Sequence, residues 1–261
     1  MNQQFSDRVV LITGASRGIG LLLTTRFARS GASVVFAARR GEPLKRLESE
    51  LTLAGHRVAA VVADVGRQED CERLVATAVE RFGTVDILVN NAGISGVQKP
   101  IWEIDVAELD EVMKINVNGA LSCIRYAAPH MIAKKRGVIV NIGSFTGKRP
   151  ALNRTVYATS KMALVGLTRT AALELAQHRV RCNLISPGPV EGERVEEVVS
   201  RAARAQNLSP EEIRRSFLAW TPLGEMVTEG EICDMVFFLA SDAGRHMTGQ
   251  DINMDGGTVM Y

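Results

Sequence analysis

The sequence lacks both a strong charge excess and any long apolar run. Its 31 lysine and arginine residues face 29 aspartate and glutamate residues, so the formal net charge is only +2. Such a balance gives no electrostatic basis for binding nucleic acid or anionic membranes. No uncharged apolar stretch approaches the roughly 20 residues that a transmembrane helix requires, and the opening residues MNQQFSD do not resemble a secretion signal. We therefore expect a cytoplasmic protein with no nucleic-acid or membrane partner.

Cysteine and histidine are scarce and scattered. The four cysteines are Cys71, Cys123, Cys182 and Cys233, and the four histidines are His56, His130, His178 and His246. No Cys-x-x-Cys pair occurs, and no histidine lies at the spacing of a zinc ligand, which argues against a zinc site. We predict that the protein has no metal site and that its cysteines are reduced and act as small apolar residues.

Strand-like and helix-like segments alternate along the whole chain. Apolar strands are predicted over residues 8–13, 33–38, 57–63, 85–90, 137–143, 180–186 and 251–254. Amphipathic segments lie between them, and two of these close on Gly55 and Gly83 at the position that favours a left-handed residue. This alternation predicts the α/β class, with a single doubly wound parallel sheet of Rossmann type covered by helices on both faces. With no repeat or linker present, residues 1–261 are expected to form one domain.

A glycine-rich turn joins the first predicted strand to the helix expected over residues 18–30. The segment 9–20 reads VVLITGASRGIG. Gly14, Gly18 and Gly20 would allow a tight turn and a close approach of the backbone to a pyrophosphate, while the N-terminus of the helix would attract the anion. A turn that merely needs positive φ is the structural alternative. The context nevertheless favours phosphate binding.

Tyr157 and Lys161 lie four residues apart in a predicted helix, where residues at this spacing are neighbours on one face. A free tyrosine titrates near pH ~10, so acid–base work near neutrality requires a pKa shift of roughly three units, or ~4 kcal/mol. A nearby ammonium lowers the cost of forming phenolate. Such a pair alone would be typical of an amphipathic surface, but here it is accompanied by Ser144 and the glycine-rich turn.

Several motifs occur in one order over almost the whole chain. They are Thr13–Gly20 (TGASRGIG), Asp64–Val65, Asn90–Gly93 (NNAG), Asn116, Ser144, Tyr157-x-x-x-Lys161, Pro187–Gly188 and Gly249–Gly257 (GQDINMDGG). This set strongly resembles the short-chain dehydrogenase/reductase family, and within it the 3-oxoacyl-acyl-carrier-protein reductases. The resemblance implies an oxidoreductase that transfers a hydride between a nicotinamide cofactor and a carbonyl or secondary alcohol.

The resemblance also implies roles for individual residues. Tyr157 would be the general acid in reduction and the base in oxidation, and Ser144 would hydrogen-bond the substrate oxygen. Lys161 would hold the nicotinamide ribose and depress the pKa of Tyr157. Asn116 would order a water that carries protons out, although a helical asparagine bonded to backbone is also a common structural motif. The implied cofactor contacts are Gly14, Ser16, Arg17, Gly18, Ile19, Gly20, Arg39, Asp64, Val65, Asn91, Ala92, Gly93, Tyr157, Lys161, Pro187, Gly188 and Val190.

The end of the second predicted strand bears on cofactor choice. A carboxylate at that point would bind a free ribose 2′-hydroxyl and repel a 2′-phosphate. Ala38 stands where family members that prefer NAD usually carry aspartate, and Arg39 and Arg17 could clamp a phosphate. We therefore predict NADP as the cofactor and keep NAD as the alternative. Arg39 could instead be an ordinary solvated charge.

Residues 191–222 are predicted to form a substrate lid of two short helices. Their charges are nearly balanced, with five arginines and six glutamates, so an anionic substrate does not follow from them. Gly192 occupies the place where many family members have a threonine that contacts the nicotinamide carboxamide. That departure leaves one cofactor contact in question.

The sequence leaves the small-molecule substrate open. Lys148, Arg149 and Arg154 lie between Ser144 and Tyr157 and could favour a carboxylate, phosphate, sulfonate or acyl-carrier thioester, or could equally face solvent. An NAD-dependent sugar or polyol dehydrogenase is one alternative function. An NADP(H)-binding sensor or scaffold without turnover is another, although the presence of all four catalytic residues favours an enzyme.

The resemblance further implies a homotetramer. The helix predicted over residues 155–177 carries apolar residues on more than one face, among them Ala158, Met162, Val165 and Leu167. A single sheet would not cover all of them.

Overall fold

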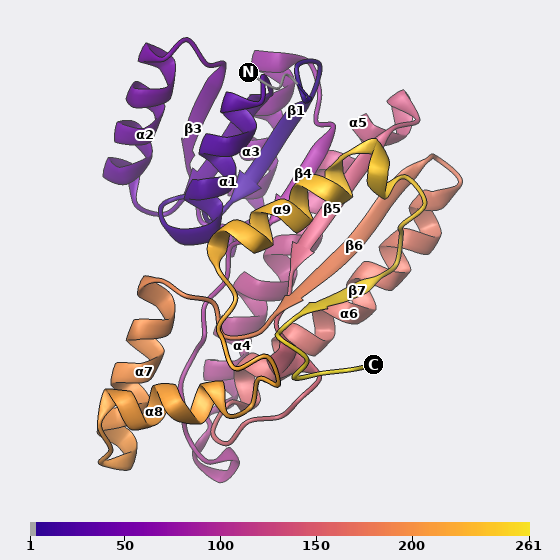
Figure 1. Ribbon diagram of the computed structural model, residues 1–261. Coiled ribbons are helices and arrows are strands. Elements are labelled where there is room, and N and C mark those ends of the chain that lie inside the picture. Colours follow the sequence, from indigo (N-terminus) through magenta and orange to yellow (C-terminus); the bar gives the residue numbers. More distant parts are fainter. Residues whose placement is uncertain (1–3) are drawn as a thin grey trace.

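The strands of the protein form one parallel sheet, and their order determines where a ligand can bind (Figure 1). The computed structural model describes residues 4–261, apart from the side chains of Arg194 and Ala205. The strands are β1 (Val9–Thr13), β2 (Ser33–Ala38), β3 (Val58–Val62), β4 (Ile87–Asn90), β5 (Gly137–Ile142), β6 (Val180–Pro187) and β7 (Asp251–Met254). Their order is β3-β2-β1-β4-β5-β6-β7. The chain builds outward from β1 and returns to its other side at β4, which opens a crevice beyond the carboxyl ends of these two strands.

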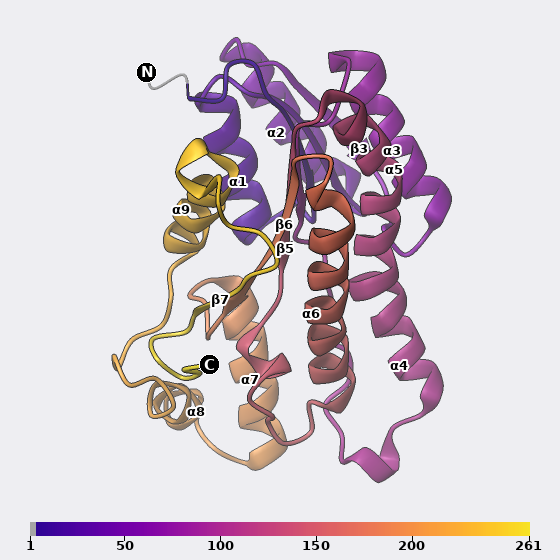
Figure 2. The same cartoon turned by 90° about the vertical axis from the view of Figure 1, so that its right-hand side faces the viewer.

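Helices cover both faces of the sheet, as Figure 2 shows with the sheet seen on edge. One face packs against α1 (Gly18–Arg29), α2 (Gly41–Leu53) and α9 (Glu229–Ala240). The other packs against α3 (Gln68–Phe82), α5 (Gly119–Lys134) and α6 (Thr155–Ala176). Because both faces are covered, every residue of β1, β2 and β4 is buried, and these strands contain continuous apolar runs rather than an alternating pattern.

The remaining elements connect the strands and the helices of the two layers. They are α4 (Val106–Met113), the π-helix η2 (Lys114–Asn118), the 3₁₀ turns η1 (Ile101–Glu103), η3 (Phe145–Gly147) and η4 (Asp242–Gly244), and the helices α7 (Glu193–Gln206) and α8 (Pro210–Leu218). α7 and α8 lie beyond the carboxyl ends of the strands, at the lower left of Figure 1. Their apolar faces pack against each other through Val199, Ala203 and Ile213.

The predicted doubly wound α/β sheet is confirmed, and the strand limits agree to within about two residues. The largest difference is at β4, which begins at Ile87 rather than at residue 85. Asp86 precedes it, and its buried carboxylate accepts a hydrogen bond from the Val9 backbone N–H at 2.9 Å. Gly55 and Gly83 have φ of +82° and +85°, as the helix ends require. No helix among the described residues is long and apolar enough to cross a bilayer.

Candidate active site

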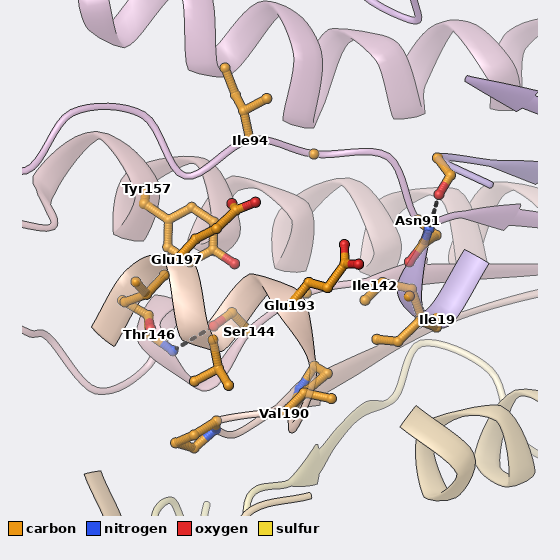
Figure 3. Close-up of a pocket in the computed structure, with 18 of the residues that line it drawn as sticks. Ile19, Asn91, Ile94, Ile142, Ser144, Thr146, Tyr157, Val190, Glu193 and Glu197 are labelled. Carbon is orange, nitrogen blue, oxygen red and sulfur yellow. Dashed lines mark hydrogen bonds between the residues drawn. The ribbon is translucent and has the colours of Figure 1, made fainter. Parts of the chain in front are cut away.

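A cleft of about 980 Å³ opens at the crevice between β1 and β4. It is lined by the glycine-rich turn, by the residues that follow β2, β3, β4, β5 and β6, and by the inner faces of α7 and α8. Figure 3 shows Tyr157 and Ser144 together on one side of this cleft, with Ile19 and Asn91 at the other. Most of the residues expected to contact a cofactor therefore share one cavity, whereas Gly20 and Lys161 do not line it.

The glycine-rich turn is held by the segment after β4. The side-chain amide of Asn91 donates to the carbonyls of Thr13 and Gly14 at 3.0 and 3.1 Å. A Cβ on Gly14 would lie 2.8 Å from the Ala92 Cα, and a Cβ on Gly20 would lie 2.4 Å from the Gly14 carbonyl oxygen. These two glycines are therefore required by contacts within the protein. Gly18, at φ +60°, has only the Glu229 carboxylate near its Cβ position and lines the cleft.

Tyr157 and Lys161 lie on the first turns of α6, beside the end of β5. The residue Lys161 is 4% exposed, and its ammonium donates to the Ile142 carbonyl at 2.8 Å and lies 5.6 Å from the centroid of the Tyr157 ring. The Ser144 hydroxyl oxygen accepts the Thr146 N–H at 3.2 Å, as the dashed line in Figure 3 shows. This bond uses one acceptor site of the hydroxyl, so the Ser144 O–H can still donate its hydrogen to a ligand in the cleft.

Asn116 is buried in the π-helix and connects three parts of the site. Its Oδ1 accepts the Ile94 N–H at 2.8 Å, and its Nδ2 donates to the Ile94 carbonyl at 2.9 Å and to the Ser160 hydroxyl at 3.0 Å. The Ser160 hydroxyl in turn donates to the Tyr157 carbonyl at 2.8 Å. The side chain therefore ties the loop after β4 to the helix that carries Tyr157, which is the structural role that the sequence left open for it.

At the end of the cleft opposite Tyr157, the two arginines near the predicted phosphate site differ in their ion-pair partners. Arg39 is exposed, lines the cleft and forms no ion pair with any described carboxylate. Arg17 instead donates to Glu197 of α7 at 2.5 Å and lies 3.7 Å from Glu193. Hydrogen bonding to the Glu197 carboxylate raises the pKa of the Arg17 guanidinium. Arg17 is thus paired with α7 in this structure, and its expected part in clamping a phosphate stays a prediction.

Sequence reasoning missed the acidic side of the cleft. Glu193, Glu197 and Glu229 all line it, and the first two reach in from α7 in Figure 3. Burial, with the nearby charge of Glu193, raises the pKa of Glu229 above its usual value. The capping box that begins α9 marks the start of that helix in the sequence, but it does not reveal that Glu229 faces the glycine-rich turn.

The backbone conformation at residue 192 explains why a glycine stands where many family members have a threonine. Gly192 has φ +125°, and a Cβ there would lie 2.7 Å from a carboxylate oxygen of Glu229. A threonine at this position would therefore be strained and crowded.

The three cations between Ser144 and Tyr157 have separate environments. Lys148 is buried against Asp251 at 2.8 Å and also donates to Asn253. Arg149 stacks 5.1 Å from the Trp220 ring and does not line the cleft. Arg154 lines the cleft and lies 4.5 Å from the centroid of the Tyr157 ring. The sequence offered two roles for these cations, facing solvent or binding a substrate anion, and neither role fits all three of them.

The residues present fit a nicotinamide dinucleotide. The cleft is large enough for a bound cofactor and substrate, exposes the backbone of a turn that is free of side chains at Gly14 and Gly18, and runs from Arg39 to Tyr157. The four cysteines are buried in the core and take no part in it.

Comparison with known proteins agrees with this geometry. The family model described as short chain dehydrogenase matches residues 8–203. The chain is 34% identical to the 3-oxoacyl-acyl-carrier-protein reductase of Thermotoga maritima, with 98% of this chain and 100% of that protein covered. It is 35% identical to the sorbitol dehydrogenase of Cereibacter sphaeroides, over 98% of this chain and 99% of the other. The crystal structure of NAD⁺-bound xylitol dehydrogenase superposes with a TM-score of 0.92, at 32% identity over 97% of this chain and 100% of that one.

The Asn116 network predicts a large effect on stability. Replacing Asn116 with alanine should lower the free energy of unfolding by about 2–4 kcal/mol, because the Ile94 N–H and C=O lose their partner inside the protein. Denaturant unfolding measures this difference. Asn118→Ala, at an exposed position of the same π-helix, should change stability by less than about 0.5 kcal/mol. Equal effects of the two substitutions would contradict the structural role of Asn116.

Proposed function

The chain belongs to the short-chain dehydrogenase/reductase family, whose members act on alcohols and carbonyl compounds, and we propose that it is an NADP(H)-dependent ketoreductase that uses Tyr157 as its general acid. One observation carries this proposal. The Tyr157 ring lies beside the buried ammonium of Lys161, in a cleft that Ser144 also lines. In the direction of alcohol oxidation, the same phenol acts as the base.

The protein's own groups hold the substrate oxygen and move its proton. Ser144 donates a hydrogen bond to that oxygen, because its hydroxyl hydrogen is not used by the bond that it accepts from the Thr146 N–H. The Tyr157 hydroxyl then delivers its proton to the same oxygen, and the Lys161 ammonium stabilises the phenolate that remains. Removing roughly three pKa units from a tyrosine requires ~4 kcal/mol, which a cation in a low-dielectric site can contribute. The bound cofactor supplies or accepts the hydride.

For the cofactor, we propose that Gly14, Ser16, Gly18 and Ile19 hold the pyrophosphate and that Asp64 and Val65 contact the adenine end. The remaining contacts would come from Asn91, Ala92, Gly93, Pro187, Gly188 and Val190, with Tyr157 and Lys161 at the nicotinamide ribose. Arg39 supports NADP over NAD because it is an exposed cation at the end of β2 with no ion-pair partner among the described residues, and because its neighbour Ala38 presents no carboxylate.

We also propose that residues 191–222 act as a lid within one domain of 261 residues. α7 and α8 pack on each other and line the cleft with their inner faces. The ion pairs of Arg17 with Glu193 and Glu197 join α7 to the glycine-rich turn, and their partners are largely exposed. Exposed pairs contribute little stability, so this contact could break when a cofactor phosphate enters.

Assembly into a homotetramer is proposed on the outer surface of α5 and α6. Met162 and Leu173 are 50% and 80% exposed, and Leu121 of α5 is also exposed. The reasoning from the α6 sequence needs one correction, since Val165 is already buried with Ala120 and Leu184, and Leu167 packs against the same cluster. The unpartnered apolar surface is therefore smaller than the sequence indicates.

The acid–base assignment predicts that Tyr157→Phe lowers kcat/KM by about 10²–10⁴-fold while cofactor binding stays near normal, since only the proton donor is lost. Lys161→Ala should weaken both. Steady-state rates and fluorescence titration of the reduced cofactor measure the two effects. Tyr126→Phe is the control, because that hydroxyl accepts a hydrogen bond from Gln68 at the surface. Retention of more than about a tenth of the wild-type kcat/KM, a loss under ~1.4 kcal/mol, would show that Tyr157 is not the acid.

The cofactor assignment predicts that a double variant, Ala38→Asp with Arg39→Ser, moves preference toward NAD. Losing a charge-assisted contact and adding repulsion should together change the ratio of kcat/KM values by ~3 kcal/mol, or about two decades. Arg46→Ser removes an exposed charge from α2 outside the cleft and should leave the ratio unchanged. Added salt should weaken NADP binding more than NAD binding. A wild type that prefers NADH would contradict the phosphate contact and favour an NAD-dependent polyol dehydrogenase.

The assembly proposal predicts a particle of about four times 28.3 kDa in multi-angle light scattering at micromolar concentration. Leu173→Glu should lower that mass, because it would place a charge in the proposed interface. Leu53→Glu introduces the same charge at an exposed leucine of α2 and should leave the mass unchanged. A monomer mass for the wild type would rule out the tetramer.

A further inference from the structure

A buried ion pair lies at the end of the turn that begins with Ser144. The Lys148 ammonium is 2.8 Å from Oδ1 of Asp251 and also donates to the Asn253 side chain. The side chains of Lys148 and Asp251 are only 8% and 5% exposed. Lys148 does not line the cleft, so this cation is not placed to bind a substrate anion there. Because two buried charges are costly to remove from water, each depends on the presence of the other.

The turn itself is compact and links the two residues at its ends. Ser144 and Lys148 flank the 3₁₀ turn η3. The N–H groups of Gly147 and Lys148 donate to the carbonyls of Ser144 and Phe145 at 3.1 and 2.9 Å. Gly147 packs closely on α6, since a Cβ on it would lie 3.0 Å from the Lys161 carbonyl carbon. A displacement of Lys148 would therefore be transmitted through the turn to Ser144.

The carboxylate of Asp251 holds both ends of this turn. Its Oδ1 receives the Lys148 ammonium and also accepts a hydrogen bond from the Ser186 hydroxyl at 2.6 Å. That hydroxyl adjoins the residue before Ser144, because a Cβ on Gly143 would lie 3.1 Å from its oxygen. The other carboxylate oxygen, Oδ2, is buried and has no hydrogen-bond partner among the described residues. The charge of Asp251 thus relies on its contacts at Oδ1.

The segment after β7 supports the same turn. The Tyr261 hydroxyl donates to the Lys148 carbonyl at 3.1 Å. The Asn253 amide donates to the carbonyls of Val259 and Tyr261 at 3.0 and 3.2 Å, which fixes this segment beside β7. Lys148 is therefore held by β7 through its side chain and by the segment after β7 through its backbone.

We infer that Lys148 and Asp251 are positioning residues that hold the Ser144 hydroxyl where it can donate to the substrate oxygen. This inference rests on the proposed function, in which Ser144 binds that oxygen. Removing the ammonium leaves the carboxylate buried without its partner, so the turn must open to admit water to the remaining charge. The effect would fall on the reaction rather than on cofactor binding, because neither residue lines the cleft.

A double-mutant cycle tests whether Lys148 acts through Ser144. kcat/KM is measured with ethyl 3-oxobutanoate, cyclohexanone and acetophenone, each with NADPH and with NADH so that cofactor choice does not mask turnover. Lys148→Met should lower kcat/KM by about 30-fold in the wild type, as expected when a transition-state hydrogen bond is partly lost. The same change should cost less than about threefold in a Ser144→Ala background, where the group that it positions is already absent. Equal losses in the two backgrounds would overturn the inference.

Two further variants separate positioning from a folding defect. Lys148→Met combined with Asp251→Asn removes both charges and leaves an oxygen for the Ser186 hydroxyl, so this protein should fold and bind NADP in calorimetry as the wild type does. It should still lose about tenfold in kcat/KM. Arg136→Met removes a cation that lies 2.8 Å from the buried Asp86 carboxylate, at the amino ends of the strands, and should leave kcat/KM within about twofold. A doubly substituted protein with the wild-type kcat/KM would overturn the inference.

Hydrogen exchange measures the placement of the turn without any substrate. The amides of residues 147–149 donate to carbonyls within the turn and are protected by them. In peptides that span residues 144–152, exchange should be about tenfold faster in Lys148→Met with Asp251→Asn than in the wild type, and unchanged in Arg136→Met. Faster exchange would support this placement even if no compound is reduced and the ketoreductase proposal fails. Exchange at the wild-type rate would show that the ion pair does not hold the turn and would overturn the inference.

Discussion

The buried ammonium of Lys161 is the group on which the geometry of the site depends. The charge of a lysine that is only 4% exposed must be compensated within the protein, and the Ile142 carbonyl at the end of β5 accepts its hydrogen bond at 2.8 Å. This contact fastens α6 to the carboxyl edge of the sheet. Tyr157, one turn earlier on α6, is thereby placed in the same cleft as Ser144, which follows β5. The position of the proposed acid–base pair thus depends on a buried charge that needs an acceptor.

The opposite end of the cleft depends on close backbone packing rather than on charge. The glycine-rich turn, held by the Asn91 amide, lies so near Ala92 that Gly14 has no room for a Cβ, and Gly20 is closed by the Gly14 carbonyl. The turn is therefore rigid before any ligand arrives, which lowers the entropic cost of binding. The turn and the start of α6 thus form two fixed walls of the cleft, and the proposed lid, which exposed ion pairs join to the turn, forms the third.

Much of the fold could be predicted from periodicity and from turn residues. Alternating apolar strands and amphipathic helices imply a parallel sheet covered on both faces, and parallel strands bring the residues that follow them to one edge. Asn91, Ser144 and Gly188 could be assigned to one site for this reason, although they lie far apart in the sequence. The spacing of Tyr157 and Lys161 likewise follows from the helix repeat alone.

The sequence by itself determined the sheet, the crevice and the identity of the groups that meet there, because those follow from local patterns and strand order. Only the tertiary structure decided what each charge faces. Lys148, Arg149 and Arg154 look alike in the sequence, yet one is buried on Asp251, one stacks on Trp220 and one lies over Tyr157. Arg17 similarly turns to Glu197, which is 180 residues away. Side-chain partners of this kind arise from distant segments that packing brings together, and no local pattern encodes them.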